Sequence, residues 1–478
     1  MIKIIIGVFI TLATVIFIGI TFYWRDTFYN PTEKDIIQYF LGLPVVLTFS
    51  ILSPYFIYKI MQKHKKSQLE NQDEVANRQA IQVTEKKENR VPKNSQAFKL
   101  NIYSSTAWHN FGENEEIIEK SKQFKSPELD THLCNTYGLP ILSFRIQKLD
   151  ELLATGDEED IRFTIREKRI KQLITHQIEQ HSEVLFQVAN HLKQSAMHYD
   201  SELAYQYRMH PAWLDLNQNN NETIEEELPI VDFVPRLNQL NLYILLPEHL
   251  IHQWNESTRE KILDQFVENY SILPLQISIE YYFINQEQAY TTWLNLLEEI
   301  SKKSYEFNLI ISADSEIDQE WVDEKNWQSE AYIAAEFTSS WCIANNSTEV
   351  IDLTPQQTVN INIDEPHATQ FLQKNKLNQL AQFEQEDPFL FILDDITDIK
   401  KSKKVQQIFT EIKIEPHHFL YLKQNFGHTQ QVAKIFTFML GAHLPNDLMA
   451  MVYSTDQDSV YVYFEQYLAE NINKNLMN

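Results

Sequence analysis

A lysine, a glycine and a histidine lie within six residues of one another near the end of the chain. Lys423, Gly427 and His428 belong to the segment Leu422–Gln430, which follows a short apolar stretch and precedes a predicted helix. A glycine turn at a helix N-terminus presents backbone N–H groups that favour anions. The segment is therefore either an anion-binding site, with the lysine and histidine beside it, or a plain helix cap with a glycine turn.

The chain has two cysteines, Cys134 and Cys342, which are too few for a multi-cysteine zinc site or a disulfide framework. Cys342 stands in an apolar stretch beside Trp341, and we expect it to be a buried core thiol. Cys134 follows His132 at a spacing that two metal ligands can use, but the neighbouring sequence offers no further ligands. The sequence predicts two reduced thiols, no metal site and no cofactor.

Other titratable side chains have two interpretations. Asp394 and Asp395 are adjacent carboxylates, which suit paired-acid chemistry, or else mark a solvated strand end. The histidines of the long helical region lack the i, i+4 spacing of a ligand pair, so we expect them at the surface. These histidines are His176, His181, His191 and His198.

Glycine is scarce and charge is unevenly distributed. No two of the eight glycines lie within four residues of each other, which excludes phosphate-binding loops of the GxGxxG and GxxxxGK[ST] kinds. GxSxG and HExxH are also absent. Residues 97–478 carry 29 basic and 58 acidic residues, a net charge of −29. A body this acidic repels phosphate backbones, so nucleic-acid binding is not expected.

Two uncharged stretches at the N-terminus are long enough to cross a membrane. Residues 4–24 span roughly 30 Å as a helix and lack a signal-peptide cleavage site, and residues 36–58 form a second span, or alternatively a buried core helix. Basic residues after the second span place both termini in the cytoplasm. Residues 1–62 are therefore predicted to be a transmembrane hairpin that carries a large cytoplasmic body.

The remainder of the chain divides by composition. Residues 63–96 are polar and form a tether that cannot bury enough surface to order itself. Residues 97–228 form the N-terminal part of the body, with one long helical region over 157–198, and end in a loop. Residues 229–478 alternate short apolar strands with helices. This alternation predicts an α/β sheet that is covered on both faces.

The segment Lys423–Thr429 resembles the K-S-N-x-G-H-T motif of β-ketoacyl synthases, which belong to the thiolase-like superfamily. Residues 287–301 and 308–318 are similar to that family's nucleophile helix and the core strand after it, and Glu336 resembles the acidic member of its G-E-G-A stretch. The resemblance covers about residues 230–465. It implies a thiolase-like layered fold behind the transmembrane hairpin.

The same resemblance implies a site that has lost its catalytic residues. The family's nucleophilic cysteine is missing from the start of the predicted helix, where Gln288 stands, and the first catalytic histidine is replaced by Asp394 or Asp395. A thiolate carries the acyl group in such enzymes, and an amide cannot replace it. We therefore expect a pseudoenzyme with no catalytic residue. Its vestigial site candidates are Lys423, His428, Gln288 and Glu336.

The overall layout resembles the type VI secretion lipase adaptors, which load a phospholipase effector onto the secreted spike. The features that carry this resemblance are the N-terminal spans and the stretches 98–118, 248–269 and 309–322. It implies a catalytically inactive adaptor or chaperone in the bacterial inner membrane, with a lipase effector and a spike protein as partners. A homodimer is expected from the thiolase-like resemblance alone.

Two alternative functions remain open. One is an acyl-thioester enzyme of the β-ketoacyl synthase type, which would use Lys423 and His428 with an atypical partner such as Gln288. The other is a structural scaffold of the cell envelope without an effector.

Overall fold

The computed structural model describes most of residues 96–377 and parts of the remainder. The described segments are 96–154, 163–209, 234–252, 254, 256–285, 288–326, 332–363, 368–377, 390–392, 418–421, 426, 432–444, 451–453 and 460–467, with isolated residues elsewhere. The chain divides into two compact units, 1–93 and 94–478. No helix among the described residues is long and apolar enough to cross a membrane. The predicted spans over 4–24 and 36–58 fall almost wholly outside those residues and stay a prediction.

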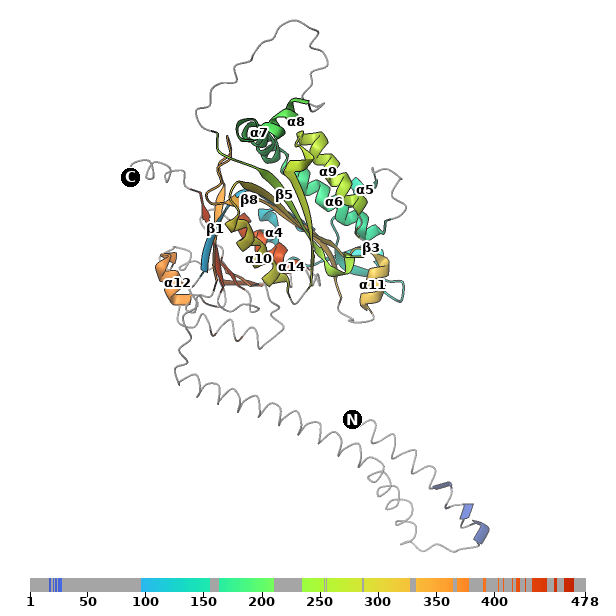
Figure 1. The fold of residues 1–478 in the computed structure, drawn as a ribbon. Helices are drawn as coiled ribbons and strands as arrows, with labels where there is room; N and C mark the ends of the chain where they lie inside the picture. The colour runs from blue at the N-terminus through green and yellow to red at the C-terminus, as the bar shows by residue number, and fades with distance from the viewer. Residues whose placement is uncertain are drawn as a thin grey trace. The chain divides into compact units, whose positions relative to one another are not determined.

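A long mixed β-sheet organises unit 94–478 (Figure 1). One half of it is built from β1 (Gln96–His109), β5 (Gln239–Pro247), β6 (Ile277–Ile284), β7 (Glu306–Ser315) and β8 (Ala334–Asn345). The other half is built from β9 (Gln357–Ile363), β10 (Leu390–Ile392), β11 (Phe419–Tyr421), β12 (Met451–Tyr453) and β13 (Tyr461–Gln466). A short strand β2 (Gly112–Glu113) pairs with the end of β1, and a hairpin of β3 (Glu128–Cys134) and β4 (Pro140–Phe144) joins β8.

The two halves share one strand order. Numbered along the chain within each half, the described strands run 3-2-4-5-1, as β6-β5-β7-β8-β1 and as β11-β10-β12-β13-β9. In each half the second strand is parallel to the third and fourth, and the fifth is antiparallel to both neighbours. β1 and β9 pair antiparallel between the halves. The sheet is therefore an internal duplication.

Helices cover both faces of this sheet. The helices are α4 (Glu115–Lys122), α5 (Gln147–Ala154), α6 (Ile165–Gln180), α7 (Ser182–Tyr199), α8 (Ser201–Met209), α9 (Glu256–Tyr270), α10 (Ala289–Lys302), α11 (Gln319–Asn326), α12 (Ala368–Lys374) and α14 (Ala433–Met439). Alternate β5 residues enter different cores: Tyr243 and Leu245 pack with α4, α10 and α14, whereas Leu242 and Ile244 pack with α6, α7 and α9. This double coverage confirms the predicted α/β class.

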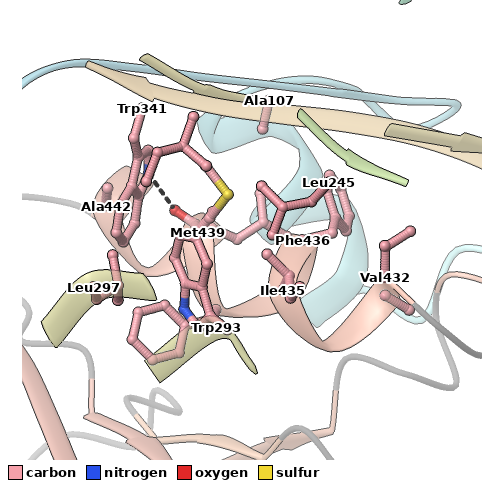
Figure 2. Close-up of a cluster of buried hydrophobic side chains, with 14 of the residues drawn as sticks. Ala107, Leu245, Trp293, Leu297, Trp341, Val432, Ile435, Phe436, Met439 and Ala442 are labelled. Atoms are coloured by element: carbon pink, nitrogen blue, oxygen red, sulfur yellow. Dashed lines mark hydrogen bonds between the residues drawn. The ribbon is translucent and has the colours of Figure 1, made fainter. Parts of the chain in front are cut away.

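The core on one face is dominated by α10 and α14 (Figure 2). Trp293 of α10 lies 5.6 Å from Phe438 of α14 and 5.8 Å from Trp341 of β8, measured between ring centroids. The Trp341 indole donates a hydrogen bond of 3.2 Å to the Met439 carbonyl. Each of these helices follows the third strand of its half, so the duplicated order brings two equivalent helices into one core.

The helical region predicted over 157–198 is two helices rather than one. α6 begins with a capping box, in which the Thr164 side chain accepts from the Glu167 N–H and the Glu167 carboxylate accepts from the Thr164 N–H. The chain leaves helical geometry at His181, where the buried imidazole contacts Ser340 of the sheet. The break between the two helices therefore lies at a residue that contacts the distant strand β8. The local sequence periodicity does not indicate such a contact.

Candidate functional site

Glu336 of β8 lies at the centre of a buried ion-pair network. Its side chain is 0 % exposed and accepts two hydrogen bonds of 2.7 Å from Nε and Nη2 of Arg169 on α6. The Ile146 N–H donates to the same carboxylate at 2.6 Å and the Ser315 hydroxyl at 2.9 Å. Bidentate guanidinium–carboxylate pairing is the strongest geometry for such a contact. Four donors thus occupy this carboxylate.

The network continues from Arg169 into the β3–β4 hairpin. Asp150 of α5 accepts hydrogen bonds from Arg169 and from Arg145 Nη1, and Arg145 Nε donates to Asp130 of β3 at 2.7 Å. Burial by itself raises the pKa of Asp130, but hydrogen bonds from Arg145, the backbone and Ser143 outweigh it and hold that pKa below its ordinary value. The hairpin is therefore fixed to the sheet by charged contacts.

Two further attachments hold the hairpin in place. β4 continues the sheet by pairing parallel with the start of β8, with Ser143 opposite Ala334. The side-chain amide of Gln319 on α11 accepts from the Cys134 N–H and donates to the Cys134 carbonyl, both at 2.9 Å. Gln319 thereby pairs with the end of β3 as a neighbouring strand would. The hairpin is thus a fixed projection of the sheet.

This fixed hairpin exposes several apolar side chains beside polar ones such as Thr131 and His132. Leu129 of β3 stands directly opposite Leu142 of β4, and both side chains are exposed. Exposed apolar residues continue into the turn and the segment before β3. We call the set the hairpin surface: Phe124 (77 % exposed), Leu129 (62 %), Tyr137 (86 %), Leu139 (60 %) and Leu142 (46 %). Single exposed apolar residues are ordinary, but the Leu129–Leu142 pair with further exposed apolar residues in the same hairpin makes a candidate binding surface.

A polar pocket lies beside the hairpin surface. Its volume is about 140 Å³, and Leu129 is part of its wall. Side chains of both charges line it, among them Glu128, Asp130, His132 and Arg145. An apolar surface with an adjoining polar rim is the usual composition of a protein–protein interface.

A second buried charge cluster lies at the end of β7. Arg166 Nη2 donates to Asp314 at 2.8 Å, and its guanidinium group stacks 4.0 Å from the Trp321 ring centroid. Glu316 accepts a hydrogen bond of 2.6 Å from the Tyr332 hydroxyl. Burial, and then the nearby Asp314, raise the pKa of Glu316 to about 7. This carboxyl group therefore changes charge near neutral pH.

A hydroxyl–imidazole cluster joins α6 to β1 and β8. His181 Nε2 lies 2.7 Å from the Ser340 hydroxyl, and Nδ1 lies 2.9 Å from the Ser104 hydroxyl. Burial lowers the pKa of His181 to about 3, so the imidazole is neutral at physiological pH. A serine–histidine contact can begin nucleophilic chemistry, but Ser340 is fully buried, and the cluster acts as a packed polar core. The expected surface position is wrong for His181 and for His191, both of which are 1 % exposed.

The structure describes two of the four predicted site residues. Gln288 is exposed at the N-cap of α10, without a side-chain capping bond, and Glu336 is buried in the ion-pair network. Lys423 and His428, together with the acidic pair at 394 and 395, lie outside the described residues. The described residues therefore do not test whether the predicted site residues converge on one pocket.

Both cysteines have defined environments. Cys342 is fully buried in β8, as predicted, and burial raises the pKa of its thiol. Cys134 is partly exposed at the end of β3. Within the described parts of the chain, no group of three or more His, Cys, Asp or Glu side chains is placed to hold a metal ion.

One residue of the predicted Lys423–Thr429 motif is described and is packed in the core. Phe426 is buried with its ring 4.9 Å from His109, at the end of β1, and 5.2 Å from Phe436 of α14. His109 accepts a hydrogen bond at Nδ1 from the Phe111 N–H, and burial lowers its pKa to about 3. Phe426 thus packs against the end of β1 and against α14, a role that the sequence pattern did not indicate.

Comparisons with known proteins give no family by sequence. No family model matches the chain, and no curated protein sequence matches it. Among solved structures, it is similar to the ketosynthase from module 6 of the bacillaene synthase of Bacillus subtilis 168, with 7 % identity, a TM-score of 0.41, and 77 % and 72 % of the two chains covered.

Two further likenesses are of the same kind. A variant of OleA from Xanthomonas campestris has 7 % identity and a TM-score of 0.32, with 77 % of this chain and 99 % of that chain covered. The type III polyketide synthase domain of Steely1 from Dictyostelium has 10 % identity and a TM-score of 0.31, with 77 % and 100 % covered. Scores this low carry no argument about activity, and the mixed α/β class is established by the chain's own sheet.

Proposed function

We propose that this chain is a binding protein, an adaptor whose body recognises a protein partner through the hairpin surface. The observation that carries the proposal is the exposed pair Leu129 and Leu142, directly opposite each other on a hairpin that charged contacts fix to the sheet. A rigid apolar projection loses little conformational entropy on binding, which favours its use as an interface. Following the family resemblance, the partner is a type VI secretion lipase effector, which the adaptor loads onto the spike protein.

Charge supports a partner of opposite sign. The net charge of −29 over residues 97–478 creates a negative field around the body. Such a field raises the association rate of a protein with a basic surface, while apolar contacts at the hairpin set the residence time. The effector surface that meets the hairpin is therefore proposed to be apolar with a basic rim.

The position of the missing nucleophile supports binding rather than catalysis. The resemblance implies a nucleophile at the start of a helix that precedes a core strand, and we take α10 and the following β7 as the corresponding elements. Gln288 stands at that helix start, and the Cys342 thiol is sealed in the core. We also propose that the body has a thiolase-like architecture and that residues 1–62 anchor it in the inner membrane as a hairpin.

The test pairs a surface variant with a matched control. The double variant Leu129→Ser, Leu142→Ser removes two half-exposed leucines, and the control variant Ile251→Ser, Leu275→Ser removes two exposed apolar residues at two other places. Completing the burial of the leucine pair contributes about 2 kcal/mol, so the hairpin variant is expected to bind the effector roughly thirtyfold more weakly.

The measurement is the Kd between the full-length chain and the type VI secretion lipase of the same genome, by biolayer interferometry. The control variant is expected to bind like the wild type, and circular dichroism checks that both variants fold. Equal binding by the two double variants, or no binding of the lipase by the wild type, contradicts the proposal. Turnover of a malonyl thioester that is lost in His428→Ala would instead establish the acyl-thioester alternative.

A further inference from the structure

The segment that leads from α4 into the hairpin contains a strained backbone position. Phe124 follows Gln123, the C-cap residue of α4, and has a φ of 52°, in the left-handed region. This region is open to glycine, but it brings the Cβ atom of any other residue too close to the backbone. Asparagine and aspartate tolerate it best among the others, and a bulky side chain there is an outlier. Phe124 therefore occupies a position that suits its side chain poorly.

Two backbone hydrogen bonds hold Phe124 in this conformation. Its N–H donates to the Ser121 carbonyl at 3.1 Å. The Lys125 N–H donates to the Lys120 carbonyl at 3.2 Å. These bonds form a Schellman motif, which ends a helix with a left-handed residue that is usually glycine. The apolar contact that often accompanies the motif is replaced by two lysines, Lys120 and Lys125. The motif thus fixes the backbone of residue 124, and glycine would form it at lower cost.

The ring of Phe124 gains no packing that offsets this strain. Its side chain is 77 % exposed, and none of the ring contacts among the described residues includes it. Tyr305 is the other aromatic residue with a positive φ in the described part of the chain, at 67°. The Arg236 guanidinium lies 5.7 Å from the Tyr305 ring centroid, a contact that offsets the strain there. The two strained aromatic residues therefore differ in what the fold gives them.

Strain without compensation inside the protein indicates a role outside it. Residues in sparsely populated backbone regions cost free energy, and they cluster at binding and catalytic sites. A residue that breaks a local rule without a gain in the folded state is typical of a functional position. Glycine at position 124 would stabilise the free protein, so the free protein does not explain the phenylalanine. A complex that buries the ring does.

We propose that Phe124 is the aromatic anchor of the hairpin surface and that its ring enters an apolar pocket on the protein partner. The inference rests on the proposed function, whose interface it refines. Phe124 lies four residues before β3 begins at Glu128. Buried aromatic anchors carry a large share of the binding energy of protein interfaces. Because the Schellman motif already fixes the backbone, little conformational entropy is lost when the ring is captured.

A protein pocket fits this position better than a lipid surface does. Two of the three lysines near the ring are paired with glutamates, Lys120 with Glu116 at 3.4 Å and Lys125 with Glu128 at 3.5 Å. The net charge of −29 over residues 97–478 is repelled by anionic headgroups. A single phenyl ring without a strong basic patch contributes little to membrane binding. The ring is therefore assigned to the effector.

Phe124→Gly distinguishes this role from a structural one, because it should strengthen the fold and weaken the complex. The Kd between the full-length chain and the type VI secretion lipase of the same genome, by biolayer interferometry, is expected to rise at least tenfold. Hydrogen exchange of the free chain, corrected for intrinsic rates and followed by mass spectrometry, is expected to slow roughly fivefold at the end of α4. That factor corresponds to the cost of a left-handed residue other than glycine.

Two variants provide matched controls. Phe124→Leu keeps an apolar side chain and the backbone strain, and is expected to bind within about threefold of the wild type with unchanged exchange. Tyr305→Gly relieves the same kind of strain outside the hairpin surface, and is expected to leave the Kd unchanged. Exchange over residues 120–126 of the free chain is expected to be equal in nanodiscs of neutral and of anionic lipid.

Several results would overturn the proposal. These are a rise in Kd of less than tenfold in Phe124→Gly, no slowing of exchange at the end of α4, and binding by Phe124→Leu as weak as that of Phe124→Gly. Slower exchange over residues 120–126 with anionic lipid assigns the ring to a membrane and also overturns it. Binding that weakens in Leu129→Ser, Leu142→Ser but not in Phe124→Gly removes this inference alone. No binding of the lipase by the wild type removes the adaptor proposal together with it.

Discussion

Substitution of Glu336 by glutamine is the sharpest test of the role of this buried carboxylate. The carboxylate accepts four hydrogen bonds and its partner Arg169 is 2 % exposed, so Glu336→Gln removes the bidentate counter-ion of a buried guanidinium and leaves it only Asp150. Breaking a buried ion pair on one side costs about 3–5 kcal/mol of unfolding free energy. The glutamine amide also places a donor against the guanidinium donors, which adds to the loss.

Replacement of both partners provides the control. In Glu336→Leu with Arg169→Met no charge is stranded in the pair, and the main remaining cost is the fixed Ile146 N–H without an acceptor, about 1–3 kcal/mol, because the Ser315 hydroxyl can rotate. The double variant is therefore expected to be more stable than Glu336→Gln. The measurement is urea unfolding of unit 94–478, followed by tryptophan fluorescence. If Glu336→Gln stays within about 1 kcal/mol of the wild type, the carboxylate is not structural and the argument fails.

Three further predictions concern other buried groups. Burial raises the pKa of Glu316 from an ordinary 4.5 to about 7, so the free energy of unfolding falls as pH rises through this interval. The free energy of unfolding of Glu316→Gln should therefore exceed that of the wild type by about 3 kcal/mol at pH 8 but by little at pH 5. Urea titrations at the two pH values measure this difference, and an equal difference at both would contradict the argument. Native Cys342 should resist alkylation by iodoacetamide while Cys134 reacts, as mass spectrometry of the intact chain can count, and modification of two sites without denaturant would contradict this. Gly441→Ala should cost about 1–3 kcal/mol because a Cβ atom would lie 2.3 Å from the Phe464 ring, and an unchanged melting temperature would show that the ring moves aside freely.

The sequence predicts the buried strands well and the polar ones poorly. β5 and β7 are dominated by apolar residues, the pattern that predicts a buried strand. β3 reads ELDTHLC, in which polar residues interrupt the alternation, whereas β9 reads QTVNINI, whose alternating Val359, Ile361 and Ile363 are a strand signal that was missed. β3 pairs with the adjacent β4, whereas β9 pairs with β1 and β13, which lie far away in the sequence. The setting of β9 therefore depends on neighbours that a sequence window does not contain.

Long-range partners also explain what was missed at the site. Glu336 is recognisable as an acidic residue in an apolar stretch, but its partner Arg169 lies 167 residues away. His181 and His191 have the spacing of surface residues and are buried because β1, β8 and the segment before β5 supply their hydrogen-bond partners. The duplicated strand order is equally hidden, because the two halves repeat a topology rather than a sequence.

The position of β1 has a consequence for synthesis of the chain. β1 is the first strand of the body to leave the ribosome, yet its partners are β8 and β9, which begin at residues 334 and 357. At a typical elongation rate, the wait from the end of β1 to the start of β8 is roughly 10–50 seconds. During that time most of a 14-residue strand with open hydrogen-bonding edges must remain unpaired, since only its last residues pair with the short β2. Nascent chains of this protein are therefore expected to depend on ribosome-associated chaperones until translation is nearly complete.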